Sequence, residues 1–240
     1  MNLSWKLTGK HVAFVLSGVL VSLLPLLAKE YWEEKNYTQW NEQEAMAMLT
    51  NSPWSRASSI PGNYGGTAPP RVIQPGSAAS SSSDLSRTGG LGGSNSIPLY
   101  IRWYSSQQVR QAMCRLGILH GNLSESTANE FLKQPMPDYA ICISCQMMEP
   151  FNRVTFDTAK PKTFLLSKKD KAKKIELKSY SPPKERQDNL VVFMFPRSLN
   201  DKPTVELADD EIIFVTETGP SKFRATFKLA RMVVNGNLDL

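Results

Sequence analysis

The clearest patterns along the chain are apolar runs that predict β-strands. Residues 223–229 alternate phenylalanine, alanine and leucine with polar side chains, which is typical of a strand with one buried face. Residues 139–143 are almost continuously apolar and predict a strand buried on both faces. Residues 190–195 predict the strongest core strand, and residues 98–103 a further one.

Other segments show the three- and four-residue apolar spacing of helices. Ser105 or Ser106 is expected to cap a helix whose apolar face runs from Val109 to Leu116. Ser124 is expected to cap a second helix, which Pro135 ends.

A short helix is also predicted near the N-terminus. Asn41 and Glu44 have the spacing of a capping box, Trp40 and Ala45 that of a hydrophobic staple, and Pro53 stops the helix. Because so short a helix is marginal alone, we expect it to dock on its own domain, with a partner or a membrane surface as the alternative.

These elements predict an α+β fold. A small mixed unit of strand, helix, helix and strand is followed by antiparallel strands and hairpins. Residues 163–168 and 174–180 predict one hairpin across a lysine-rich turn, and residues 211–216 and 223–229 a second one. Asn235-Gly236 predicts a last turn.

Composition divides the chain into four stretches. Residues 57–96 contain 10 Ser, 8 Gly and 4 Pro among 40 positions, which predicts a disordered linker. We expect an aromatic-rich helical segment at residues 29–56 and an α+β globular domain at residues 97–240.

Residues 1–28 have the pattern of a signal peptide or an N-terminal membrane anchor. Lys6 and Lys10 precede an apolar run at residues 12–24, and Ala28 offers a cleavage position. If uncleaved, residues 11–28 are just long enough to span a bilayer, which would associate the chain with the membrane. Either reading places residues 29–240 outside the cytoplasm, in the periplasm or anchored at the membrane; a buried core helix is the remaining alternative.

Few residues offer catalytic or metal-binding chemistry. The sequence holds only two histidines, and His120 follows a predicted helix, where a structural role is expected. Cys142 and Cys145 lie in or at the end of a predicted strand, where residues three apart point to opposite faces, so we expect buried thiols. A disulfide with Cys114 and an active redox pair are the alternatives. We assign no catalytic, cofactor-binding or metal-ligating residue.

The formal net charge of +6 has a local origin. Residues 160–178 hold eight lysines against Asp170 and Glu176. Such a patch suits an acidic protein or an anionic lipid surface. Nucleic acid is disfavoured, since no aromatic residue interleaves the lysines to stack bases. The alternative interpretation is a solvated hairpin tip whose lysines protect a strand edge against aggregation. The candidate interaction residues are Trp32, Trp40, Trp54, Lys168, Lys169, Lys171, Lys173 and Lys174.

A motif of the form QWxxxEA followed by LTxSPW begins at Gln39 and ends at Trp54. It is similar to a motif of uncharacterised exported acidobacterial proteins. Arg102-Trp103 before a helix and the pattern of residues 227–238 fit the same resemblance. The resemblance implies a bacterial envelope location and a structural role for Trp40, Pro53 and Trp54, and it implies no activity or cofactor.

Together these features favour a non-catalytic binding or assembly module of the cell envelope, with an envelope protein or an anionic lipid surface as its partner. One alternative is an envelope enzyme, hydrolase-like and of unfamiliar type, that uses His120 or scattered carboxylates. Another is a protein that binds anionic lipids through residues 160–178.

Overall fold

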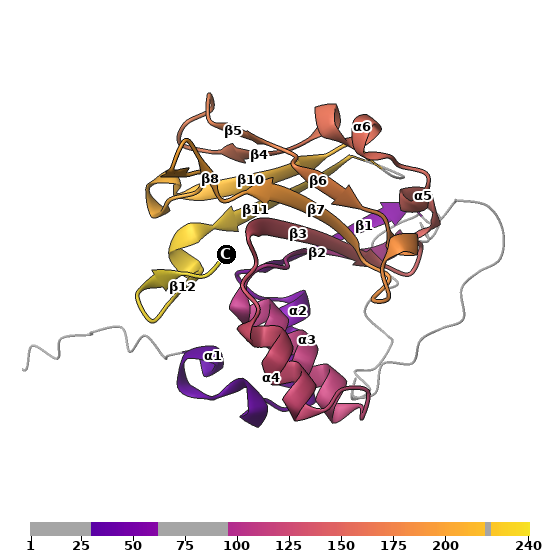
Figure 1. Ribbon diagram of the computed structural model, residues 1–240, viewed down its shortest axis with the longest axis vertical. Coiled ribbons are helices and arrows are strands. Elements are labelled where there is room, and N and C mark those ends of the chain that lie inside the picture. The colour runs from indigo at the N-terminus through magenta and orange to yellow at the C-terminus, as the bar shows by residue number, and fades with distance from the viewer. Residues whose placement is uncertain (1–29, 62–95, 219–221) are drawn as a thin grey trace, which may run out of the picture.

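Two antiparallel sheets and a group of helices make up the fold (Figure 1). The computed structural model of the chain describes residues 30–61, 96–218 and 222–240. Helices α2, α3 and α4 gather at one end of the molecule, beside β2 and β3 (Figure 1). The α+β class expected from the sequence is confirmed.

The first sheet has five strands in the spatial order β1-β2-β3-β7-β6, and each neighbouring pair is antiparallel. Their bounds are β1 Ser55–Pro61, β2 Ser96–Trp103, β3 Asp138–Cys145, β7 Val191–Pro196 and β6 Ser179–Ser181. The strands predicted at residues 98–103, 139–143 and 190–195 are β2, β3 and β7.

The second sheet has four antiparallel strands in the order β11-β10-β4-β5. Their bounds are β11 Phe223–Lys228, β10 Glu211–Thr216, β4 Thr163–Ser167 and β5 Lys174–Glu176. Two small hairpins complete the strands: β8 Ser198–Leu199 with β9 Lys202–Pro203, and β12 Val233–Val234 with β13 Asn237–Leu238. Asn235 and Gly236 have positive φ at the predicted last turn, which joins β12 to β13.

The α-helices are α1 Tyr31–Glu34, α2 Glu42–Thr50, α3 Gln107–Leu119, α4 Glu125–Lys133, α5 Glu149–Asn152 and α6 Phe156–Ala159. Short 3-10 turns are η1 Tyr37–Gln39, η2 Lys160–Lys162, η3 Pro183–Glu185, η4 Leu207–Asp209 and η5 Leu229–Arg231.

The helix caps predicted from the sequence are confirmed. The Asn41 side chain accepts a hydrogen bond from the Glu44 N–H at 2.8 Å, and the Glu44 carboxylate accepts one from the Asn41 N–H at 2.9 Å. Ser106 caps α3 and Ser124 caps α4. These side chains bind backbone N–H groups that the first turn of a helix leaves unpaired.

The main core lies between the two sheets. The Phe193 and Phe214 rings are 5.3 Å apart between centroids, and so are the Trp103 and Phe227 rings. The other face of β3 is covered as well, because Cys142 packs in a second cluster with Met113 of α3. The prediction that this strand is buried on both faces is therefore confirmed.

The N-terminal segment belongs to the same core. Trp40 and Trp54 are fully buried there, so α2 docks on its own domain. Residues 57–61, which composition assigned to the linker, instead form most of β1 and pair with β2. Ile60 is fully buried, which stabilises a strand in spite of its serine-rich sequence.

The predicted strand at residues 174–180 is divided between the two sheets. Its first part, β5, pairs with β4, whereas its last residues join β6, which pairs with β7. Ile175 and Leu177 are buried in alternation, but Lys178 and Ser179 are both exposed before Tyr180 is buried. This slip of one residue reverses the buried face at the point where the segment passes from the second sheet to the first.

Some expectations lie outside the described residues. These are the signal or anchor at residues 1–28, residues 62–95 of the linker and the turn at Gly219-Pro220. Among the described helices, none has the length and apolar character needed to cross a membrane.

Candidate functional site

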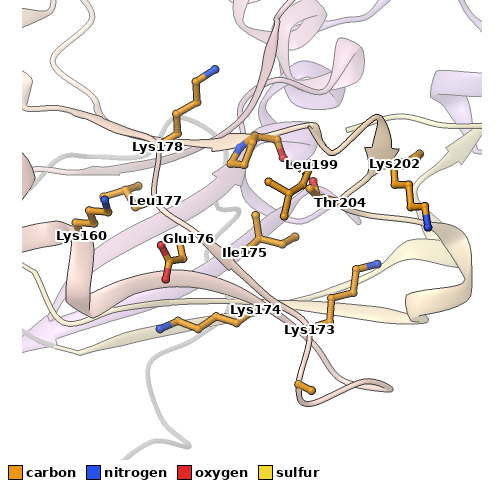
Figure 2. A pocket seen from close by; sticks show the side chains of 13 residues that line it. Lys160, Lys173, Lys174, Ile175, Glu176, Leu177, Lys178, Leu199, Lys202 and Thr204 are labelled. Atoms are coloured by element: carbon orange, nitrogen blue, oxygen red, sulfur yellow. Dashed lines mark hydrogen bonds between the residues drawn. The ribbon is translucent and has the colours of Figure 1, made fainter.

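A groove opens between the β5 segment and the β8–β9 hairpin, with a volume of about 610 Å³ (Figure 2). Five lysines surround it: Lys160, Lys173, Lys174, Lys178 and Lys202. We call it the lysine-rimmed groove. Its apolar lining comes from Ala172, Ile175, Leu177, Pro196, Leu199 and Pro203.

The groove exists because two neighbouring chain segments part. Ser179 of β6 is opposite Met194 of β7 in the first sheet. Before that point the chain pairs with β4 in the other sheet, while after β7 it runs into the β8–β9 hairpin. The hairpin turn uses Asn200 and Asp201, whose φ angles of 52° and 60° suit the turns that tightly link two strands.

The lining combines a buried apolar floor with one exposed apolar side chain. Ile175 and Leu177 are 5% and 2% exposed, so they belong to the core as well as to the groove. Leu199 is 65% exposed, more than any other large apolar side chain among the described residues. Figure 2 shows Ile175, Leu199 and Thr204 facing the same space. An apolar contact is therefore available beside the lysines.

Two of the rim lysines are already paired with carboxylates. Lys173 Nζ donates to both Asp209 oxygens, at 2.7 and 2.9 Å, and Lys178 Nζ donates to both Asp138 oxygens at 2.8 Å. Burial by itself would raise the pKa of Asp209, but the Lys173 ammonium and nearby hydrogen-bond donors hold this pKa below its ordinary value. These pairs fix the ends of the β5 segment to η4 and to β3.

The other three rim lysines have no such partner within residues 30–61, 96–218 and 222–240. No carboxylate among the described residues lies within 4.0 Å of Lys160, Lys174 or Lys202. Lys174 Nζ lies 4.5 Å from the centre of the Phe164 ring, a favourable cation–π position. Glu176 is the one acidic residue of the lining. The groove therefore combines apolar surface with an excess of positive charge.

The structure separates the predicted lysines. Lys173 and Lys174 line the groove, whereas Lys168 pairs with Glu211 at 2.9 Å, outside the lining. Its hydrogen bond to Glu211 raises the pKa of Lys168 and lowers the pKa of Glu211. Lys169 and Lys171 are exposed on the turn between β4 and β5 and do not line the groove.

The predicted tryptophans do not reach the groove. Trp40 and Trp54 are 0% exposed, which removes them from any contact surface of the folded chain. Trp32 is half-buried and packs edge-on against Trp54 with 5.7 Å between ring centroids. It lines a second, smaller cavity of about 390 Å³ together with Arg56 and Arg231.

Sequence reasoning missed Leu199 and Lys202 as site residues. One feature of the sequence could have indicated this hairpin: the Asn-Asp pair between Leu199 and Lys202 is typical of a two-residue hairpin turn. Nothing in the sequence places this hairpin opposite β5, because that proximity depends on the pairing of β6 with β7.

The histidine and cysteines lie elsewhere. His120 Nε2 is 3.0 Å from a Glu42 carboxylate oxygen, so this side chain ties the end of α3 to the start of α2. All three cysteines are free thiols, and burial raises the pKa of Cys142. Within the described part of the chain, no three histidine, cysteine or acidic side chains cluster closely enough to hold a metal ion.

The chain was also compared with known proteins. No protein-family model, curated protein or solved structure matches it significantly. The resemblance to exported acidobacterial proteins stays a prediction. Function is therefore inferred from the shape and charge of the lysine-rimmed groove.

Proposed function

We propose that this chain is a non-catalytic binding or assembly module of the cell envelope, and that its lysine-rimmed groove holds an acidic segment of a partner protein. The observation that carries the proposal is the combination, in one groove, of an exposed leucine and three lysines that pair with no carboxylate among the described residues.

The positive charge of the rim lysines favours a negatively charged partner. Lys160, Lys174 and Lys202 come from η2, β5 and β9 and all three line the groove, which makes its electrostatic potential positive. A carboxylate there gains attraction from several lysines at once, and its apolar neighbours gain by covering Ile175 and Leu199. A basic partner would be repelled by the same rim.

The geometry favours a protein segment over a lipid surface. The lysine-rimmed groove runs between the β5 segment and the β8–β9 hairpin, and its apolar lining lies between these two segments. A flat anionic membrane would instead meet Lys169 and Lys171, which are exposed on the turn outside the groove. The two possibilities therefore depend on different lysines.

The envelope location rests on the pattern of residues 1–28. A fusion of the full chain to alkaline phosphatase, which is active only outside the cytoplasm, tests it. We expect an active fusion, and loss of activity when the apolar run at residues 12–24 is interrupted by two arginines. An inactive fusion of the unaltered chain would contradict the proposed location.

Binding can be tested with the full chain and fluorescein-labelled poly-glutamate, measured by fluorescence anisotropy. The test variant carries Lys160→Glu, Lys174→Glu and Lys202→Glu. The control variant carries Lys169→Glu, Lys171→Glu and Lys184→Glu, which make the same change in net charge outside the groove. We expect the test variant to lose affinity by at least about tenfold and the control variant to lose much less.

Two results would contradict the proposal. One is an equal loss of affinity in both variants, because it would show attraction by net charge alone. The other is binding that does not weaken with salt, since exposed charge pairs are screened. Vesicles containing phosphatidylglycerol serve as a further probe. If the chain binds them and only the control variant loses this binding, the result would favour the lipid-binding hypothesis instead.

A further inference from the structure

At the lysine-rimmed groove, the β5 strand presents main-chain groups that pair with no other strand in the part of the chain that the structure describes. It is the end strand of its sheet, and β4 is its only strand partner among the described residues. An edge strand of this kind is a template on which another extended chain can pair.

The register shows which groups are unpaired. The Ser167 N–H donates to the Lys173 C=O at 3.2 Å, which makes these opposite residues a hydrogen-bonded pair. Such pairs recur at every second residue of an antiparallel ladder, so Ile175 is bonded to Leu165. The N–H and C=O groups of Lys174 and Glu176 therefore point away from β4, and both residues line the groove.

The opposite wall of the groove cannot supply the same pairing. It contains Pro196 and Pro203, and proline has no N–H to donate. This wall offers apolar contact through Leu199 instead. A chain lying in the groove would thus bond to β5 along one edge and pack against the β8–β9 hairpin along the other.

An extended chain places successive side chains on opposite faces. Acidic side chains on one face can reach the rim lysines, and apolar side chains on the other can cover Ile175 and Leu199. We propose that the groove binds an extended peptide of alternating acidic and apolar residues, which adds as a fifth strand beside β5. This proposal rests on the proposed function and specifies the form of its partner.

Three synthetic peptides test it on the full chain. The first alternates glutamate and valine over eight residues. The other two carry the same sequence with N-methyl groups on the odd or on the even backbone amides, which block donation along one edge without changing charge. We expect one methylated peptide to lose affinity by at least about tenfold and the other to bind like the parent, because a strand pairs with β5 along one edge only.

Hydrogen exchange of the protein amides gives an independent readout. The Lys174 and Glu176 amides are expected to exchange rapidly in the free chain and to be protected in the complex with the parent peptide. The Ile175 amide, already bonded to Leu165, should change little.

The outcomes separate the two proposals. Equal affinity of all three peptides, or unprotected Lys174 and Glu176 amides in the complex, overturns strand addition and leaves acidic binding standing. Binding of poly-glutamate without binding of the parent peptide would likewise overturn strand addition and leave the binding of acidic segments standing. If neither probe binds, the proposed function itself fails, and strand addition fails with it.

Discussion

The carboxylate of Asp239 lies at the first turn of α3, where it accepts a hydrogen bond from the backbone N–H of Gln107 at 2.8 Å. A second carboxylate oxygen accepts from the Gln108 N–H at 3.1 Å and from the Ser106 hydroxyl at 2.7 Å. A negative charge at this end of a helix is favoured by the helix dipole. Asp239 thus joins the last residues of the chain to the start of α3.

Replacing Asp239 by alanine should destabilise the fold. The change leaves two backbone N–H groups without their charged acceptor, and we expect the free energy of unfolding to fall by about 2 kcal/mol. Asp239→Asn keeps an oxygen acceptor and loses the charge, so its effect should be about half as large. Urea unfolding monitored by circular dichroism measures both variants; equal stability of Asp239→Ala and the unaltered chain would contradict this role.

Two buried tryptophans form a matched pair for a second prediction. Trp54 Nε1 donates to the Asp239 C=O at 2.7 Å, whereas Trp103 Nε1 is buried and has no hydrogen-bond partner among the described residues. Both side chains are 0% exposed. Trp54→Phe should therefore reduce the free energy of unfolding by about 1–2 kcal/mol more than Trp103→Phe, since only the first change breaks a hydrogen bond. The same urea assay applies, and a larger loss for Trp103→Phe would refute the argument.

The ion pair between Asp209 and Lys173 predicts a dependence of stability on pH. The pKa of Asp209 in the folded chain lies below its ordinary value of 3.8. A carboxylate with a lowered pKa stabilises the fold at pH above its ordinary value, and that contribution is lost as the pH falls through the folded pKa. Asp209→Asn should thus reduce stability at pH 6, and the difference from the unaltered chain should shrink as the pH falls below 3.8.

Urea unfolding at several pH values measures this difference. Asp157→Asn is the control, because Asp157 is exposed and has no ion-pair partner among the described residues. A stability difference for Asp209→Asn that does not change with pH would contradict the assigned ion pair.

The N-terminal segment should be required for folding. Removal of residues 1–61 deletes Trp40, Trp54 and the whole of β1, and so exposes the core that they cover. Losing one side chain of this size from a core typically costs about 3–5 kcal/mol. Losing both therefore removes most of the stability of an ordinary domain, which is about 5–15 kcal/mol. We expect residues 62–240 to show no cooperative unfolding transition. A sharp transition near that of the full chain would show that the domain begins after the linker.

Much of the fold could be predicted because its signals are local. The capping box at Asn41 and Glu44 and the caps Ser106 and Ser124 depend on residues three apart. The alternation in β11 is equally direct, since every second side chain faces the core. Such features are read from one short window of sequence.

The missed features depend on distant partners. The serine-rich residues of β1 form a strand only because β2 pairs with them, from across a long intervening segment. The crossing from β5 to β6 follows from a slip in the buried alternation at Lys178 and Ser179. The groove follows from that crossing together with the β8–β9 hairpin, so its members could not be grouped from sequence spacing alone.

The pairing of Pro61 with Ser96 places the two residues that flank residues 62–95 in the sequence opposite each other in the first sheet. Both residues are neighbours at one end of β1 and β2, so inserted residues need not disturb the register of either strand. In general, doubling the length of a flexible loop raises the entropic cost of bringing its two ends together by only about 0.6 kcal/mol. This position is therefore suited to carrying a reporter, such as a fluorescent protein or an affinity tag, within the chain while both termini stay unaltered.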